Sequence, residues 1–143
     1  MNKYLYLTQT DTTLGFVSQD APKIDKAKKR LPNKHYIRTV DSFKTLKSFT
    51  RIPTQHKNLV RRAKRTTFII NKESYRVIRG TQHNLLLNRV GWLYSSSANL
   101  SGAGYDEGYA KEMTEVIISS PSETRGNASK IYKLGTKIIH KIR

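Results

Sequence analysis

A short apolar run that leads into a dense group of hydroxyl side chains is the feature that most constrains this chain. It occupies residues 92–102, Trp-Leu-Tyr-Ser-Ser-Ser-Ala-Asn-Leu-Ser-Gly. This pattern predicts a buried strand that ends in a loop, and in open α/β sheets such loops border ligand sites. Hydroxyl and backbone N–H groups can bind a phosphate or a carboxylate from several sides, whereas a serine-rich surface turn is the plainer alternative.

The charge of the chain predicts a polyanionic partner. Lys and Arg number 27 against 10 Asp and Glu, which gives a formal net charge of +17. Basic residues gather at 23–34, 57–72 and 130–143. An excess of this size favours RNA or DNA first and an acidic membrane surface second, and solubility alone is the competing explanation.

Length and composition indicate one domain over residues 1–143 with a single core. The chain has no cysteine, which excludes disulfides and thiolate metal sites. Apolar runs are too short for a membrane span, and the first residues are too few for a signal peptide. We therefore expect a cytoplasmic protein that does not bind a membrane.

The hydrophobic pattern predicts alternating strands and helices, hence an α/β or α+β fold with a mixed sheet. Strands are expected at residues 3–8, 35–40, 66–71, 74–79, 92–95, 116–119, 130–134 and 138–142. Helices are expected at residues 21–30, after the Ser42 cap, and at 55–64, 82–90 and 109–114. The side chains expected to face the core from two of these helices are Leu59, Val60, Ala63, Leu85, Leu86 and Leu87.

Two polar strand ends and a set of cations form the candidate site. Residues 10–13 and 95–101 are both rich in hydroxyls and are expected to face each other across the sheet. The cations are Lys28, Arg30, Lys34 and Arg79, with His83 four residues after Arg79. Arginine and lysine with hydroxyls suit phosphate and carboxylate groups. The alternative explanation for the lysines is a solvated helix face. For His83 the alternative is a helix cap or a ring packed in the core.

Several classes of enzyme are excluded by the motifs that the chain lacks. Its four histidines are scattered without metal-ligand spacing. There is no phosphate-binding loop, no dinucleotide-binding glycine motif and no nucleophile elbow. No pair of carboxylates suits glycoside hydrolysis.

Several motifs, in the same order, resemble those of the YrdC-like family, the threonylcarbamoyl-AMP synthases. Residues 95–102 resemble the family motif Ser-x-Ser-Ala-Asn-x-Ser-Gly, and residues 10–15 resemble its Thr-Asp/Glu-Thr-x-Tyr-Gly. Lys28-Lys29-Arg30 followed by Lys34 keeps a Lys-x-Arg-x-x-x-Lys spacing. Four further positions match residues of the family: Thr67, Arg79, His83 and Ser129. The resemblance spans residues 4–134.

The resemblance implies a twisted mixed β-sheet flanked by helices, with a basic concave cavity. It also implies a reaction in which threonine and bicarbonate form a carbamate that attacks the α-phosphate of ATP. Mg²⁺ would accompany ATP, and no side chain would serve as a nucleophile or a metal ligand. The product, threonylcarbamoyl-AMP, is the donor for modification of adenosine 37 (t6A37) in tRNA.

By resemblance, the site residues fall into two groups. ATP and its phosphates would contact Lys28, Arg30, Lys34, Ser95, Ser97, Asn99 and Ser129. Threonine and the carbamate would contact Thr10, Thr12, Thr67 and Arg79, with His83 as a further candidate. Adenylation depends mainly on positioning and on neutralising phosphate charge, which these residue types provide.

Three functions are consistent with the sequence. The first is a synthase that takes ATP, L-threonine and bicarbonate and passes its product to the t6A transfer machinery proteins. The second is a catalytically weakened module of the same fold that binds double-stranded RNA or tRNA. The third is a regulatory subunit that binds a nucleotide or a carbamoyl compound.

Overall fold

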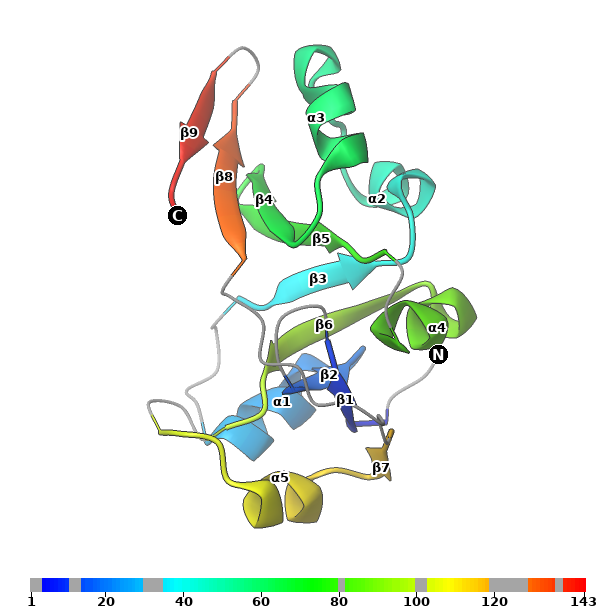
Figure 1. Ribbon diagram of the computed structural model, residues 1–143, viewed down its shortest axis with the longest axis vertical. Coiled ribbons are helices and arrows are strands. Elements are labelled where there is room, and N and C mark those ends of the chain that lie inside the picture. Colours follow the sequence, from blue (N-terminus) through cyan, green and yellow to red (C-terminus); the bar gives the residue numbers. More distant parts are fainter. Residues whose placement is uncertain are drawn as a thin grey trace.

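The computed structural model describes residues 4–10, 14–29, 35–79, 82–99, 103–118, 129–135 and 138–143, with only the backbone of 82–84. The described strands form one mixed sheet in the order β7-β1-β2-β6-β3-β5-β4-β8-β9 (Figure 1). Their bounds are β1 Tyr6–Gln9, β2 Leu14–Ser18, β3 Ile37–Val40, β4 Thr66–Ile70, β5 Glu73–Val77, β6 Trp92–Ser97, β7 Val116–Ile117, β8 Lys130–Leu134 and β9 Ile139–Lys141.

The helices of the described chain are short. They are α1 Ala21–Lys28, α2 Phe43–Phe49, α3 Lys57–Arg62, α4 Gln82–Val90 and α5 Glu107–Met113, with a 3₁₀ turn at Thr54–His56. None of these helices has the length and apolarity needed to cross a bilayer. The expected mixed sheet with flanking helices is thus confirmed.

The two faces of the sheet differ in chemistry, as strand alternation requires. On the first face, Phe16, Tyr94, Val40, Tyr75 and Phe68 follow one another across five neighbouring strands. Their side chains belong to two core clusters, one packed under α2 and α3 and the other under α1 and α5. This face is therefore the main hydrophobic core.

The second face combines a small apolar patch with a polar surface. Val17, Leu93 and Ile78 pack there against Leu87 of α4. The same strands also place Gly15, Ser95, Thr39 and Arg76 on this second face. The hydroxyls of Ser95 and Thr39 thus lie on the face opposite the main core.

Local sequence signals explain where the helices begin and end. Ser42 accepts a hydrogen bond from the Thr45 backbone N–H at 3.1 Å, which caps α2. Asp106 caps α5 in the same way through the Tyr109 N–H at 3.0 Å. Gly91 follows α4 with a φ of +89°, a conformation that side chains with a Cβ rarely adopt.

The structure corrects several details of the sequence prediction. Strand β2 was not expected, because Leu14–Ser18 is short, contains a glycine and follows the polar residues 10–13. Leu85 is 66% exposed and Leu59 is 39% exposed, although both were expected to face the core. Each of these short helices fully buries one side chain instead, Leu87 in α4 and Val60 in α3.

Candidate functional site

Helix α1 brings a lysine ammonium to the end of β6. Lys28, the last residue of α1, is only 2% exposed. Its Nζ donates to the carbonyl oxygen of Ser97 at 2.8 Å and to that of Asn99 at 2.9 Å. It also lies 3.4 Å from Ser97 Oγ and 3.3 Å from Asn99 Oδ1. Because a buried charge is costly unless it is hydrogen-bonded, these four oxygens fix the ammonium beside the serine-rich turn.

The turn after β6 is held by its own polar groups. Ser97 Oγ donates to Asn99 Oδ1 at 2.5 Å, and Asn99 Nδ2 donates to the Ala103 carbonyl at 2.5 Å. The Asn99 backbone N–H donates to the Ser97 carbonyl at 2.9 Å. Ser97 is exposed, so its hydroxyl meets solvent next to Lys28. A polar group already held in place loses little conformational entropy when it binds an anion.

Glycine brings the two hydroxyl-rich strand ends together. Gly15 of β2 pairs with Ser97 of β6 and with Thr8 of β1. A Cβ at Gly15 would lie 2.9 Å from the Ser96 carbonyl oxygen and 2.9 Å from Thr10 Cγ2. It would also lie 3.7 Å from Ser95 Oγ. Thr10 and Ser95, both predicted site residues, therefore each lie within 4 Å of the position that a Cβ on Gly15 would take.

A second polar cluster is buried on the same sheet face. Arg76 of β5 is 6% exposed and donates to Thr67 Oγ1 at 2.8 and 3.0 Å, from Nη2 and Nε, and to Ser129 Oγ at 2.7 Å. The hydroxyl oxygens of these two residues, Thr67 Oγ1 and Ser129 Oγ, lie 3.3 Å apart. Arg143 adds a bond to the Ser129 carbonyl at 3.0 Å. The guanidinium thereby sets the positions of two hydroxyls.

Sequence reasoning missed Arg76 as a member of this cluster. Tyr75 and Val77 of β5 face the core, so strand alternation places Arg76 on the opposite face. The pairing of β5 with β4 sets Arg76 opposite Thr67, since Phe68 pairs with Tyr75. The signal was therefore present in the two-residue period of the strand.

The remaining predicted residues do not join these clusters in the described structure. Arg79 is exposed and donates to the Ala63 carbonyl at 3.4 Å and to the Arg61 carbonyl, at the end of α3. Its predicted contact with threonine or phosphate stays a prediction. His83 belongs to α4, but its side chain is not described, and the predicted residues outside the described chain are Thr12, Arg30 and Lys34.

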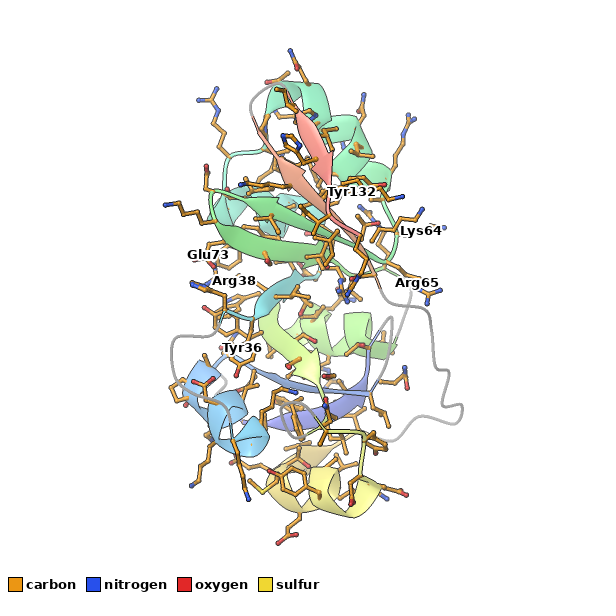
Figure 2. The ribbon with its side chains drawn as sticks, turned by 90° about the vertical axis from the view of Figure 1, so that its left-hand side faces the viewer. Tyr36, Arg38, Lys64, Arg65, Glu73 and Tyr132 are labelled. Carbon is orange, nitrogen blue, oxygen red and sulfur yellow. The ribbon has the colours of Figure 1, made fainter. Side chains whose placement is uncertain are left out.

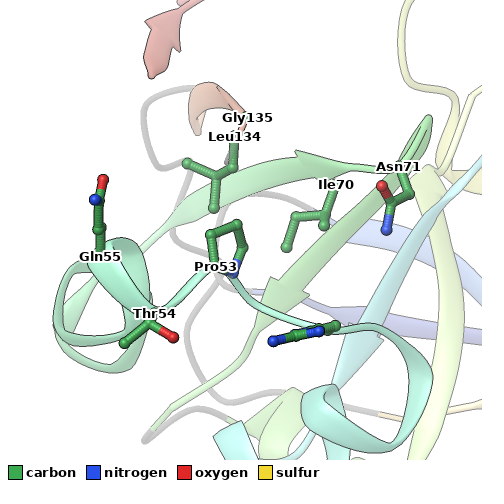
Figure 3. Close-up of a pocket in the computed structure, with 8 residues that line it drawn as sticks. Pro53, Thr54, Gln55, Ile70, Asn71, Leu134 and Gly135 are labelled. Atoms are coloured by element: carbon green, nitrogen blue, oxygen red, sulfur yellow. The ribbon is translucent and has the colours of Figure 1, made fainter. Parts of the chain in front are cut away.

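A surface pocket of about 510 Å³ lies elsewhere, between the turn after α2 and the ends of β4 and β8 (Figure 3). Pro53, Thr54, Ile70 and Leu134 line it, and its lining includes none of the predicted site residues. Within the described part of the chain, no group of three or more His, Cys, Asp or Glu residues could hold a metal ion.

Comparison with solved structures identifies the fold. Two structures of Sua5 from P. abyssi match 98% of this chain, with TM-scores of 0.81 and 0.79 at 19% and 22% identity. The second of these is a complex with L-threonine. The chain has the Sua5/YrdC fold. It covers 52% and 50% of those two Sua5 chains. E. coli YciO has the same fold, with a TM-score of 0.72 at 12% identity over 99% of this chain and 82% of YciO.

Comparison of sequences finds curated relatives that are uncharacterized. No family model matches the chain. It is 30% identical over 140 residues to the uncharacterized protein MG259 homolog of Mycoplasma pneumoniae, across 91% of this chain. It is also 30% identical over 143 residues to MG259 of Mycoplasma genitalium, across 92% of this chain. The chain spans about 30% of the length of these two curated relatives.

Proposed function

We propose that this chain is a threonylcarbamoyl-AMP synthase domain that uses ATP, L-threonine and bicarbonate. The observation that carries the proposal is the Lys28 ammonium, buried against Ser97 and Asn99 at the end of β6. A fixed cation beside exposed hydroxyl and amide groups suits a phosphate that gains negative charge during reaction. The Sua5 structure with bound L-threonine supports the choice of amino acid.

The proposed reaction requires positioning more than acid–base chemistry. The threonine amine and bicarbonate condense to a carbamate with loss of water. A carbamate oxygen then attacks the α-phosphorus of ATP, the bond from that phosphorus to the bridging oxygen breaks, and pyrophosphate leaves. Lys28 would stabilise charge on the α-phosphate, and Ser97 and Asn99 would orient it. Mg²⁺ would arrive bound to ATP.

The second cluster supports a proposed position for the amino acid. Thr67 and Ser129 present hydroxyls whose directions are set by Arg76. We assign Thr67 to threonine or the carbamate and Ser129 to the nucleotide, and Arg76 is a positioning residue because it acts through both. Thr10 and Ser95 would complete the surface between the two clusters.

Pyrophosphate release tests the synthase directly. The assay contains ATP, L-threonine, bicarbonate and Mg²⁺, and each substrate is omitted in turn. We expect Lys28→Met to lower the rate by about a hundredfold, the scale for losing one charge-stabilising group. Lys26→Met is the control, because Lys26 is exposed on the same helix. Ser97→Ala, at an exposed position, should lower the rate about tenfold without affecting folding.

Two results would contradict the proposal. One is pyrophosphate release that does not depend on threonine or bicarbonate. The other is an equal rate for folded Lys28→Met and Lys26→Met variants. Absence of pyrophosphate together with salt-sensitive RNA binding would instead favour the second candidate, a module that binds tRNA or double-stranded RNA. The observation that favours this RNA-binding candidate is the high net charge of the chain.

A further inference from the structure

One edge of the sheet is a strand that has no partner on its outer side in the described chain. Strand β9 pairs with β8 alone and ends the strand order. Figure 1 shows β9 as the outermost element on this side of the molecule, and Figure 2 shows it facing the viewer together with β8, where Tyr132 is labelled. An open edge of this kind is a template for a further strand.

The backbone of β9 directs hydrogen-bonding groups away from the sheet. The Ile142 N–H donates to the Ile131 carbonyl of β8 at 2.8 Å. In an antiparallel pair such inward bonds fall on every second residue, so the N–H and C=O groups of Ile139 and Lys141 point outward. The outer side of β9 therefore offers both donors and acceptors to an added strand.

Apolar side chains are exposed along the same edge. Ile138 is 62% exposed, Ile139 is 38% exposed and Ile142 is 58% exposed. Because side chains alternate along a strand, these isoleucines lie on both faces of the sheet. The opposite edge strand, β7, has only two residues and one exposed apolar side chain, Ile117. A group of exposed apolar side chains marks a surface that a partner covers.

The charge of this edge determines the kind of partner. Residues 129–143 contain five Lys and Arg and no Asp or Glu. His140 and Lys141 of β9 are exposed. Two copies of this edge would repel each other, because like charges on opposite strands are destabilising. A strand that carries carboxylates would be attracted, because opposite charges across a strand pair are stabilising.

We propose that β9 accepts an added antiparallel strand from a partner protein, and that this strand combines aliphatic side chains with carboxylates. Aliphatic residues of the partner lie opposite Ile139 and Ile142, and Asp or Glu residues lie opposite His140 and Lys141. Main-chain hydrogen bonds supply affinity and these side-chain pairs supply specificity. The inference does not depend on the proposed synthase activity, because β9 contains no residue of the candidate site.

Two synthetic peptides test the charge preference of the edge. The acidic peptide has the core Val-Glu-Glu-Val-Val, which runs antiparallel to β9 with its first Val opposite Ile142. The control peptide has Lys in place of both Glu. Each peptide carries a fluorescent label, and binding is measured by anisotropy. We expect the native chain to bind the acidic peptide at least about tenfold more tightly than the control peptide.

Charge reversal at Lys141 tests the position of the added strand. Lys141→Glu should weaken binding of the acidic peptide and strengthen binding of the control peptide, by about fivefold each. Lys44→Glu makes the same change in net charge at an exposed position on α2, and it should change either affinity by less than about twofold.

A proline at the same position tests the backbone contact. Lys141→Pro removes the outward N–H, and an edge strand tolerates proline where its N–H faces solvent. Lys141→Ala is the matched control, because it removes the side chain and keeps the N–H. We expect the proline variant to bind the acidic peptide about fivefold more weakly than the alanine variant. Circular dichroism checks the fold, and if the proline variant is unfolded the Lys141→Glu result decides.

Several results would overturn the proposal. They are equal affinity of the native chain for the two peptides, no binding of either peptide, and equal effects of Lys141→Glu and Lys44→Glu. Sedimentation that shows a dimer of the native chain, lost in Lys141→Glu, would also overturn it, because a second copy would then occupy the edge. Pyrophosphate release should be unchanged in the folded variants, which keeps this test separate from the synthase test.

Discussion

At the scale of single residues, Gly15 permits the two hydroxyl-rich strand ends, after β1 and in β6, to pack closely against β2. Its Cα faces the Ser96 carbonyl and the Thr10 methyl, and each would lie 2.9 Å from an added Cβ. A carbonyl that is paired in a sheet cannot move away without disturbing the β2–β6 ladder. The close packing of Thr10 and the Ser96 carbonyl around position 15 therefore depends on a residue without a side chain.

Gly15→Ala tests this dependence. We expect it to lower the free energy of unfolding by about 1–3 kcal/mol, the usual cost of overpacking. Gly104→Ala is the control, because no neighbouring atom lies within 4 Å of its added Cβ. Urea unfolding followed by circular dichroism measures both variants. Equal stability of Gly15→Ala and the native chain would mean that the strands are not packed this closely.

At the scale of helices and strands, Arg79 links the end of β5 to the end of α3. Its guanidinium donates to the Arg61 and Ala63 carbonyls, which are left without partners where the helix ends. We expect Arg79→Gln to speed amide exchange in α3 and to lower stability by up to about 1 kcal/mol. An unchanged exchange rate with a raised KM for threonine would place Arg79 in the substrate site instead.

Glu115 links α1 to β1 and contributes a pH-dependent stability. The hydrogen bond from Lys23, and then that from the Leu5 backbone N–H, hold the pKa of the Glu115 carboxyl below its usual range. A lowered folded-state pKa stabilises the fold above the unfolded-state pKa, and the effect is lost as pH falls through the folded-state value.

Glu115→Gln should therefore be less stable than the native chain at pH 7, and this difference should be smaller at about pH 3, below the usual carboxyl range. Glu112→Gln is the control, since Glu112 is exposed on the neighbouring helix α5. Urea unfolding at the two pH values supplies the comparison. The same stability difference at both pH values would show that the Glu115 charge is not responsible.

Sequence patterns predicted most elements of the fold because their signals are local. The Ser42 cap, the Asn71-Lys72 turn between β4 and β5, and Gly91 after α4 all act within a few residues. The contact of Lys28 with Ser97 is not local, since 69 residues separate them. The resemblance to the YrdC-like family predicted that Lys28 and Ser97 belong to one site. No spacing of residues within the chain predicts this contact.

At the scale of the whole molecule, the sheet brings residues that are distant in the sequence into two polar clusters. Lys28 of α1 reaches the end of β6, next to β2. Arg76 of β5, Thr67 of β4 and Ser129, which precedes β8, form the second cluster on the polar face of the sheet. Helices α2 and α3 lie with β4, β8 and β9 at one end of the molecule (Figure 1).

The central claim is that Lys28 and the β6 turn bind the phosphates of ATP. A crystal structure with Mg²⁺, L-threonine and a non-hydrolysable ATP analogue tests it most directly. We predict an α-phosphate oxygen within hydrogen-bond distance, about 3 Å, of Lys28 Nζ. Nucleotide bound in the pocket beside Pro53 and Leu134, with no density at Lys28, would contradict the claim.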